Sequence, residues 1–293
     1  MADTVGQANI RGLDIDKLVK GFADEELIMK QYVTVTPTSA REIRWYQKTA
    51  GFIDSTDTTG ITTSQIVTVG KAKPVVAQPS FTRLTSYVKK FFLASEMIST
   101  EDEKDCDIDI IATTIRDVVR GVGRQVDLHI INTIAENFTG GTIQTIAITN
   151  EWDDVANAVP ISDLATAREY LKNYNYEPNG AVFACRPDVE RFLLNYLIAV
   201  KGSSIPQFAS AKVGNAVLLE IMGFKVVSST LVTSDKALVF VPQRSCTYKQ
   251  FMPIGSATIV DELIGKTIRV AEEGVALLTD PKSVVLFTNI GPS

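Results

Sequence analysis

The feature that most constrains the fold of this chain is a long apolar stripe of helical period within residues 99–138. Apolar residues recur there at spacings of three and four, which places them on one face of an α-helix. They are Ile108, Ile111, Ile115, Val118, Val122, Val126, Ile130 and Ile134. The stripe predicts a helix of about eight turns, whereas helices of globular proteins average about three turns.

Signals at both ends support this helix. Ser99 or Thr100 is expected to cap its start, and Glu103 stands at capping-box spacing from Thr100. Acidic residues crowd the same region, where the helix dipole favours anions. The pair Gly140-Gly141 is expected to end the helix.

The face opposite the stripe is polar. It carries Arg116, Arg120, Arg124 and Asp127. Gly121 and Gly123 interrupt the same stretch, and each costs about 1 kcal/mol relative to alanine inside a helix. The third glycine of a dinucleotide-binding fingerprint is absent, so we interpret the two glycines as a place of close packing or a bend.

Two segments ahead of the helix carry apolar residues but too few for a core. Residues 1–40 contain a short amphipathic stretch that cannot bury its apolar face alone. Residues 41–92 are rich in Thr, Ser, Val and Ile and predict strands at 41–48, 65–69 and 83–92. Such a β-rich excursion cannot form its own core. It is either a loop that packs on another subunit or an ordinary hairpin on its own domain, and the sequence leaves both open.

The second half of the chain alternates helices and strands and then returns to strands. After a linker that ends at Pro160, helices are predicted at 163–175 and 187–200, with a strand at 181–185 between them. Further strands are predicted at 216–221, 224–228, 237–241, 256–263, 267–275 and 284–289. The alternation indicates an α/β or α+β arrangement.

The sequence offers little for catalysis or metal binding. His129 is the only histidine, and Cys106, Cys185 and Cys246 share no CxxC spacing. Neither a GxxxxGK[ST] phosphate loop nor a GxSxG motif occurs. We therefore predict a protein that is not an enzyme, with no metal and no cofactor.

Charge and hydropathy exclude further classes. The formal net charge is -5, so bulk charge does not draw the chain to nucleic acid. No apolar run approaches the roughly 18 residues of a membrane span, and no secretory signal opens the sequence. We expect a protein that is made in the cytosol and binds no membrane.

The order of these elements resembles the major capsid proteins of tailed viruses, which have the Hong Kong 97-type fold. Residues 108–138, ending in NTIAENFTGG, resemble the spine helix of that family. Residues 179–192 resemble the strand and helix of its axial domain, and residues 220–229 the glycine-containing strand pair that follows. Residues 271–280 resemble a final strand of its peripheral domain.

The resemblance implies an α+β fold in five parts, with the spine helix at about 102–138. The parts are an N-terminal arm at 1–40, an extended β-loop at 41–92, a peripheral domain with the spine helix at 93–159, an α/β axial domain at 160–245, and closing strands of the peripheral domain at 246–293. It also implies pentamers and hexamers that close into an icosahedral shell around packaged double-stranded DNA, without sequence-specific binding. A scaffolding protein, a portal and decoration proteins would be its other partners. The subunit would be made in the host cytoplasm and end in the virion.

Contacts between subunits are predicted from residue type alone. Arg and Trp are enriched at interfaces, although solvated helix arginines are at least as common. The predicted contact residues are Arg41, Arg44 and Trp45 at the loop base and Arg116, Arg120 and Arg124 on the spine helix. Two alternatives stay open: a cellular nanocompartment shell of the same fold that holds cargo enzymes, and a cytosolic α/β enzyme with a β-rich accessory segment.

Overall fold

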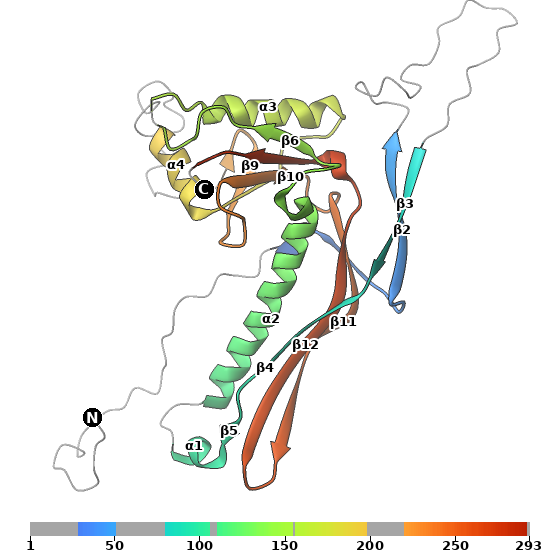
Figure 1. Cartoon of the computed structure of the whole chain (residues 1–293), viewed down its shortest axis with the longest axis vertical. Coiled ribbons are helices and arrows are strands. Elements are labelled where there is room, and N and C mark those ends of the chain that lie inside the picture. The colour runs from blue at the N-terminus through green and yellow to red at the C-terminus, as the bar shows by residue number, and fades with distance from the viewer. Residues whose placement is uncertain (1–28, 51–79, 106–109, 155, 198–219, 292–293) are drawn as a thin grey trace, which may run out of the picture.

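The computed structural model describes residues 29–50, 80–105, 110–154, 156–197 and 220–291 of the chain. Within these residues the strands form three sheets, of five, six and two strands. Figure 1 shows the six-stranded sheet and its helices at one end, with a long hairpin and helix α2 extending away from them. The predicted amphipathic stretch of the arm, the predicted strand at 65–69 and most of the one at 216–221 lie outside the described residues.

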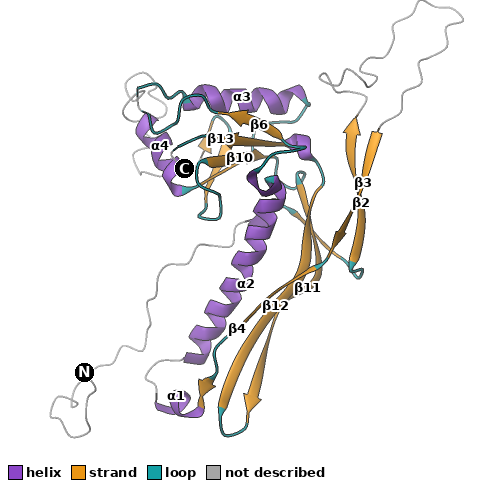
Figure 2. Ribbon diagram, viewed as in Figure 1, coloured by secondary structure: helices purple, strands orange, loops and turns teal. Residues whose placement is uncertain are grey.

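The apolar stripe of the sequence lies on helix α2 (Ile110–Ile134). Val118, Val122, Val126, Ile130 and Ile134 are all buried, so the predicted apolar face is confirmed. Figure 2 shows how α2 runs beside the hairpin from its lower part up to the six-stranded sheet. The stripe thus faces two different sheets along its length.

The ends of this helix differ from the prediction. The short helix α1 (Thr100–Asp105) does not continue the axis of α2 (Figure 1), and Ser99 caps it by accepting a hydrogen bond from Asp102 N at 3.0 Å. At the other end α2 stops at Ile134, before the 3-10 turn η3 (Glu136–Phe138). All three η3 residues have positive φ, so the chain turns before it reaches the glycine pair.

The five-stranded sheet is built on a long antiparallel hairpin. Its strands are β11 (Cys246–Asp261) and β12 (Gly265–Leu278), with β1 (Thr34–Pro37) parallel to β11, and β4 (Lys89–Ala94) and β5 (Ile98–Ser99) antiparallel to β12. The 3-10 turn η2 (Met29–Tyr32) leads into β1. Ile268 and Val270 of β12 pack against Val118 and Val122, so this sheet covers the lower part of the α2 stripe.

The six-stranded sheet has the order β6-β13-β10-β7-β9-β8. Its strands are β6 (Gln144–Ala147), β7 (Val182–Cys185), β8 (Glu220–Ile221), β9 (Phe224–Ser228), β10 (Lys236–Phe240) and β13 (Val284–Thr288). Helices α3 (Pro160–Asn173) and α4 (Pro187–Asn195) cover one face, where Leu164 and Leu193 share a core with Phe183 and Phe287. The upper end of α2 covers the other face.

The strand at 284–288 does not lie where the sequence placed it. It was expected among the closing strands of the peripheral domain, but β13 pairs antiparallel with β10 inside the six-stranded sheet. β6, expected in the part at 93–159, pairs parallel with β13 in the same sheet. The first four residues of β13 are all buried apolar residues, which is typical of a strand covered on both faces.

The third sheet is a two-stranded ribbon of β2 (Glu42–Ala50) and β3 (Ser80–Tyr87), which projects from the side of the hairpin (Figure 1). The single strand predicted at 83–92 is wrong, because the chain changes partners at Val88. Before that residue β3 pairs with β2, and after it β4 pairs with β12. No helix in the described part of the chain is long and apolar enough to cross a membrane.

Candidate functional site

The ribbon of β2 and β3 presents two different faces. One face holds Trp45 and Gln47, which attach the ribbon to its own chain. Trp45 is half-buried against the core, and its Nε1 donates a hydrogen bond to Ser86 Oγ at 3.1 Å. Gln47 is buried and its Nε2 donates to the carbonyl of Leu278 at 2.6 Å. These contacts fix the ribbon at its base.

The opposite face of the ribbon is exposed and aromatic. Because side chains alternate along a strand, Tyr46 lies across the ribbon from Trp45, and pairing brings Phe81 and Tyr87 to the same outer face. All three side chains are more than half exposed. They are not among the predicted contact residues, although alternation from Trp45 indicates Tyr46. Exposed aromatic side chains spread along one face of a ribbon are typical of a protein interface.

Near the middle of the hairpin, two neighbouring carboxylates of β12 hold the chain segments that converge there. Glu272 is fully buried and accepts hydrogen bonds from Lys30 Nζ at 2.6 Å, Tyr248 OH at 3.1 Å and Gln250 Nε2 at 3.2 Å. Burial and the nearby carboxylate raise the pKa of Tyr248, so its phenol stays protonated and donates. Lys30 precedes β1, so this pair attaches the end of the N-terminal segment to the hairpin.

The second carboxylate, Glu273, serves the ribbon and β4. It lies 3.7 Å from Arg41 and 3.8 Å from Lys90. Arg41 also stacks over the ring of Phe251, 5.0 Å from its centroid. Both cations are exposed, so these ion pairs position the strands more than they stabilise the fold.

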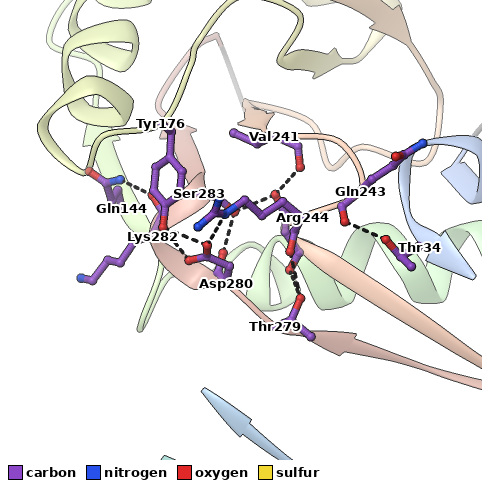
Figure 3. A network of polar contacts seen from close by, with 11 residues as sticks. Thr34, Gln144, Tyr176, Val241, Gln243, Arg244, Thr279, Asp280, Lys282 and Ser283 are labelled. Atoms are coloured by element: carbon purple, nitrogen blue, oxygen red, sulfur yellow. Dashed lines mark hydrogen bonds and ion pairs between the residues drawn. The ribbon is translucent and has the colours of Figure 1, made fainter. Parts of the chain in front are cut away.

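A polar network lies where the hairpin meets the six-stranded sheet (Figure 3). Asp280 accepts hydrogen bonds from Tyr176 OH at 2.8 Å and from Arg244 Nε at 2.8 Å, while the Arg244 guanidinium stacks 4.8 Å from the Tyr176 ring centroid. Nearby, Ser283 Oγ lies 2.8 Å from Ser245 Oγ. Burial, followed by the charge of Asp280, raises the pKa of Tyr176, which therefore donates at all ordinary pH values. The network joins the loop after α3 to both ends of the hairpin.

The groups that sequence analysis considered for chemistry have structural roles here. His129 accepts a hydrogen bond from Ala276 N at 3.3 Å through Nε2 and lies 5.4 Å from the Phe91 ring. Burial, aided by Lys89, lowers its pKa to about 4, so the imidazole is neutral at pH 7. Cys185 and Cys246 are buried, and burial raises the pKa of both thiols. Among the described residues no three His, Cys, Asp or Glu side chains gather where a metal ion could bind.

Comparison with known proteins identifies the family. A family model described as phage capsid protein matches residues 77–285, which is well over half of the chain. The chain belongs to the phage capsid protein family. No curated protein matches the sequence. This capsid protein is therefore a structural protein, as its resemblance to major capsid proteins predicted, and its place is the virion capsid.

Solved structures share the fold of this capsid protein at low sequence identity. The capsid structure of cyanophage P-SCSP1u has a TM-score of 0.68 at 14% identity, covering 96% of this chain and 93% of that chain. Mycobacterium phage Che8 has a TM-score of 0.64 at 14% identity, covering 95% and 97%. The SrpI encapsulin complex from Synechococcus elongatus PCC 7942 has a TM-score of 0.64 at 12% identity, covering 99% and 96%. The predicted Hong Kong 97-type fold is confirmed.

The predicted contact residues of this capsid protein fall into two groups. At the loop base Arg41 and Arg44 are exposed, and the Arg44 Nε donates to Glu42 at 3.0 Å, whereas Trp45 faces its own core. On α2, Arg116, Arg120 and Arg124 form one exposed row at intervals of four residues.

Asp127, predicted on the same polar face as this row, is buried at 2% exposure and accepts a hydrogen bond from Met29 N at 3.2 Å. It therefore fixes the chain ahead of β1 to the helix. Whether the arginines and Trp45 contact a neighbouring subunit stays a prediction.

Proposed function

We propose that this capsid protein assembles into pentamers and hexamers, and that these close into an icosahedral shell around packaged double-stranded DNA. The observation that carries the proposal is the ribbon of β2 and β3. A two-stranded ribbon is marginal in water by itself, and this one exposes Tyr46, Phe81 and Tyr87 on its outer face. Covering that face with a second subunit would bury it. The self-assembly of capsid proteins supplies such a partner.

The regions of the chain can be assigned to the domains of a capsid subunit. We assign the six-stranded sheet with α3 and α4 to the axial domain, at the centre of each capsomer. We assign α2 and the hairpin of β11 and β12 to the peripheral domain. Residues 1–40 would form the arm and residues 41–92 the extended loop, each completed by neighbouring subunits. The predicted bounds at 93–159, 160–245 and 246–293 would then change at two places, because β6 and β13 pair in the six-stranded sheet.

Partners beyond the shell itself follow from the same proposal. A scaffolding protein, a portal and decoration proteins would act on the assembled subunits. The net charge of -5 supports a shell that contains DNA without gripping it, and no catalytic step is required of the chain. The subunit would be made in the host cytoplasm before it enters the virion.

Purified protein tests the proposal directly. We expect sizing chromatography to give capsomers or particles and negative-stain microscopy to show closed icosahedral shells. A stable monomer at high concentration that turns over a metabolite would contradict it. Deleting residues 56–64, at the tip of the predicted loop, should leave a folded subunit that fails to assemble.

The structural likeness to an encapsulin complex supports one alternative function, that of a cellular nanocompartment shell. The two functions differ in their contents. Particles isolated from infected or lysogenic cells should contain nuclease-protected DNA if the chain is a viral capsid subunit. Particles that contain a cargo protein and no DNA would favour the nanocompartment.

A further inference from the structure

The tip of the β11–β12 hairpin exposes an apolar side chain that none of the residues described by the structure covers. Leu263 is 97% exposed, and its neighbours Val260 and Ile264 are each more than half exposed. Leu263 also has φ 65°, a left-handed conformation that bulky side chains rarely adopt. A strained backbone that presents an apolar side chain to solvent is typical of a binding site.

The tip is held rigidly at its base. Gly265 pairs with Ser99 of β5, and a side chain at Gly265 would collide with the carbonyl of Ile98. The Thr100 N donates a hydrogen bond to the carbonyl of Ile264 at 3.1 Å, which joins the tip to α1. These contacts fix the direction in which Leu263 projects.

The charge around the tip is negative. Asp261 and Glu262 flank Leu263 in the turn, and both are exposed. Glu101 and Asp102 add exposed carboxylates from α1, which lies at the same end of the molecule (Figure 1). A partner for this tip should therefore offer an apolar hollow with positive charge at its rim.

Such a hollow lies between β4 and α2. It has a volume of about 530 Å³, with apolar walls from Phe91, Phe92, Leu93 and Val122 and a floor at Gly121. Gly121 lies so close to β4 that an added Cβ would meet Leu93 at 2.9 Å, which explains the glycine inside this helix. Arg124 and Lys90 also line the hollow and carry positive charge; Lys90 lies 3.8 Å from Glu273 of its own chain, so Arg124 is the main positive group, and Phe92 is 72% exposed.

The tip of one chain does not reach the hollow of the same chain. Leu93 at the hollow pairs with Val270 of β12, whereas Gly265 at the tip lies five residues further along this strand. At about 3.4 Å per strand residue, roughly 17 Å of rigid hairpin separates the two. A hairpin tip that fills the hollow must therefore belong to another molecule.

We propose that the tip of one subunit, Asp261–Ile264, docks into the hollow between β4 and α2 of a second copy. Leu263 fills the apolar hollow, while Asp261 and Glu262 face Lys90 and Arg124 of the partner. The contact joins two different surfaces, so it repeats from copy to copy and either closes into a ring or extends. The inference rests on the proposed self-assembly and specifies one of its contacts.

Cross-linking in assembled particles tests the contact. Particles of a variant with both Leu263→Cys and Gln125→Cys, two exposed positions, should give covalent dimers and higher multimers on a non-reducing gel after mild oxidation. The matched control joins Leu263→Cys with Ala165→Cys on α3, which is equally exposed, and should stay monomeric. All variants carry Cys106→Ser, so that the native thiol takes no part. In this background, cross-linking of Leu263→Cys alone would mean that tips meet tips and would overturn the proposal.

A charge exchange gives a second, independent measurement. Asp261→Lys with Glu262→Lys should reduce the yield of particles about tenfold, because like charges then face each other. Adding Arg124→Glu should restore part of the yield; Lys90 is left unchanged because it pairs with Glu273 of its own chain. Thr230→Ala is the control for Arg124, since it removes the hydrogen bond that Arg124 makes within the subunit at 3.0 Å and leaves the charge of Arg124 in place.

The outcomes separate this contact from assembly itself. Wild-type particles with no cross-link in the double variant and no rescue by charge exchange would refute the docking and leave the shell function standing. Failure of the wild-type chain to form any particle would refute both.

Discussion

The six-stranded sheet and the distal half of the hairpin show two different ways of treating apolar residues. In the sheet, Phe183, Phe240 and Phe287 are completely buried between helices on both faces. In the hairpin, the stretch from Met252 to Ile264 is exposed throughout, although it contains six large apolar residues. The sheet is stable through contacts within one chain. The hairpin and the ribbon beside it expose apolar surface that the described residues of the same chain leave uncovered.

The difference between the two regions is tested most directly by replacing a phenylalanine with alanine in each of them. Phe287→Ala empties a site that lies 5.9 Å from the Trp152 ring and 6.3 Å from the Phe183 ring, and should lower the free energy of unfolding by about 3–5 kcal/mol. Phe81→Ala removes the same side chain from the exposed ribbon and should change it by less than about 0.5 kcal/mol. Urea unfolding of isolated subunits measures both.

Particle yield should show the opposite order for the variants that still fold. Phe81→Ala should abolish or strongly reduce assembly, because Phe81 belongs to the outer aromatic face of the ribbon. A Phe81→Ala subunit that unfolds as easily as Phe287→Ala would show that the ribbon is part of the core. A normal particle yield would show that its outer face is no interface.

The next largest effect is expected near the middle of the hairpin, where Lys30 attaches the end of the N-terminal segment. Lys30→Met leaves the buried carboxylate of Glu272 without its cation and should cost about 2 kcal/mol, less than for a fully buried pair because Lys30 is partly exposed. Unfolding of the single and double variants measures the coupling. The control, Lys30→Met with Glu272→Gln, should recover much of the loss, and an equal loss in both variants would contradict the pairing.

The sequence predicted the regions of this fold unequally. The α2 stripe was predictable, because periodicity records which side of a helix is buried. The order of strands was less so: β13 is an apolar run, and nothing in such a run says which sheet it joins. The outer face of the ribbon was missed because sequence analysis chose Arg and Trp by type, whereas Trp45 faces inward and only register places Tyr46, Phe81 and Tyr87 together. Nothing in the sequence predicted that Leu263 is exposed, since its exposure depends on the conformation of the turn between β11 and β12.

The free energy of unfolding should depend on pH through His129, which joins α2 to β12 of the hairpin. The pKa of His129 is lowered to about 4 in the folded chain, against about 6.5 when unfolded. The unfolded chain therefore binds more protons between these values, so stability is full above pH 6.5 and falls as pH drops toward 4. The loss from this group should be about 2 kcal/mol at pH 5. Comparing urea unfolding at pH 7 and pH 5 measures it, and His129→Gln should remove this part of the pH dependence; an unchanged pH dependence would contradict it.

The smallest effect is expected at the polar network that joins the two regions. Tyr176→Phe removes the hydroxyl that donates to Asp280 at 2.8 Å but keeps the ring on which Arg244 stacks. Since one half-buried hydrogen bond to a charged group is lost, we expect a cost of about 1 kcal/mol and an unchanged core. Thermal unfolding should show one small shift of the midpoint, and Ser283→Ala, which removes the Ser245 contact nearby, serves for comparison. A second, separate unfolding transition in Tyr176→Phe would mean that the six-stranded sheet stays folded while the hairpin unfolds. The polar network would then be what couples the unfolding of these two regions, one with its own core and one that depends on neighbours.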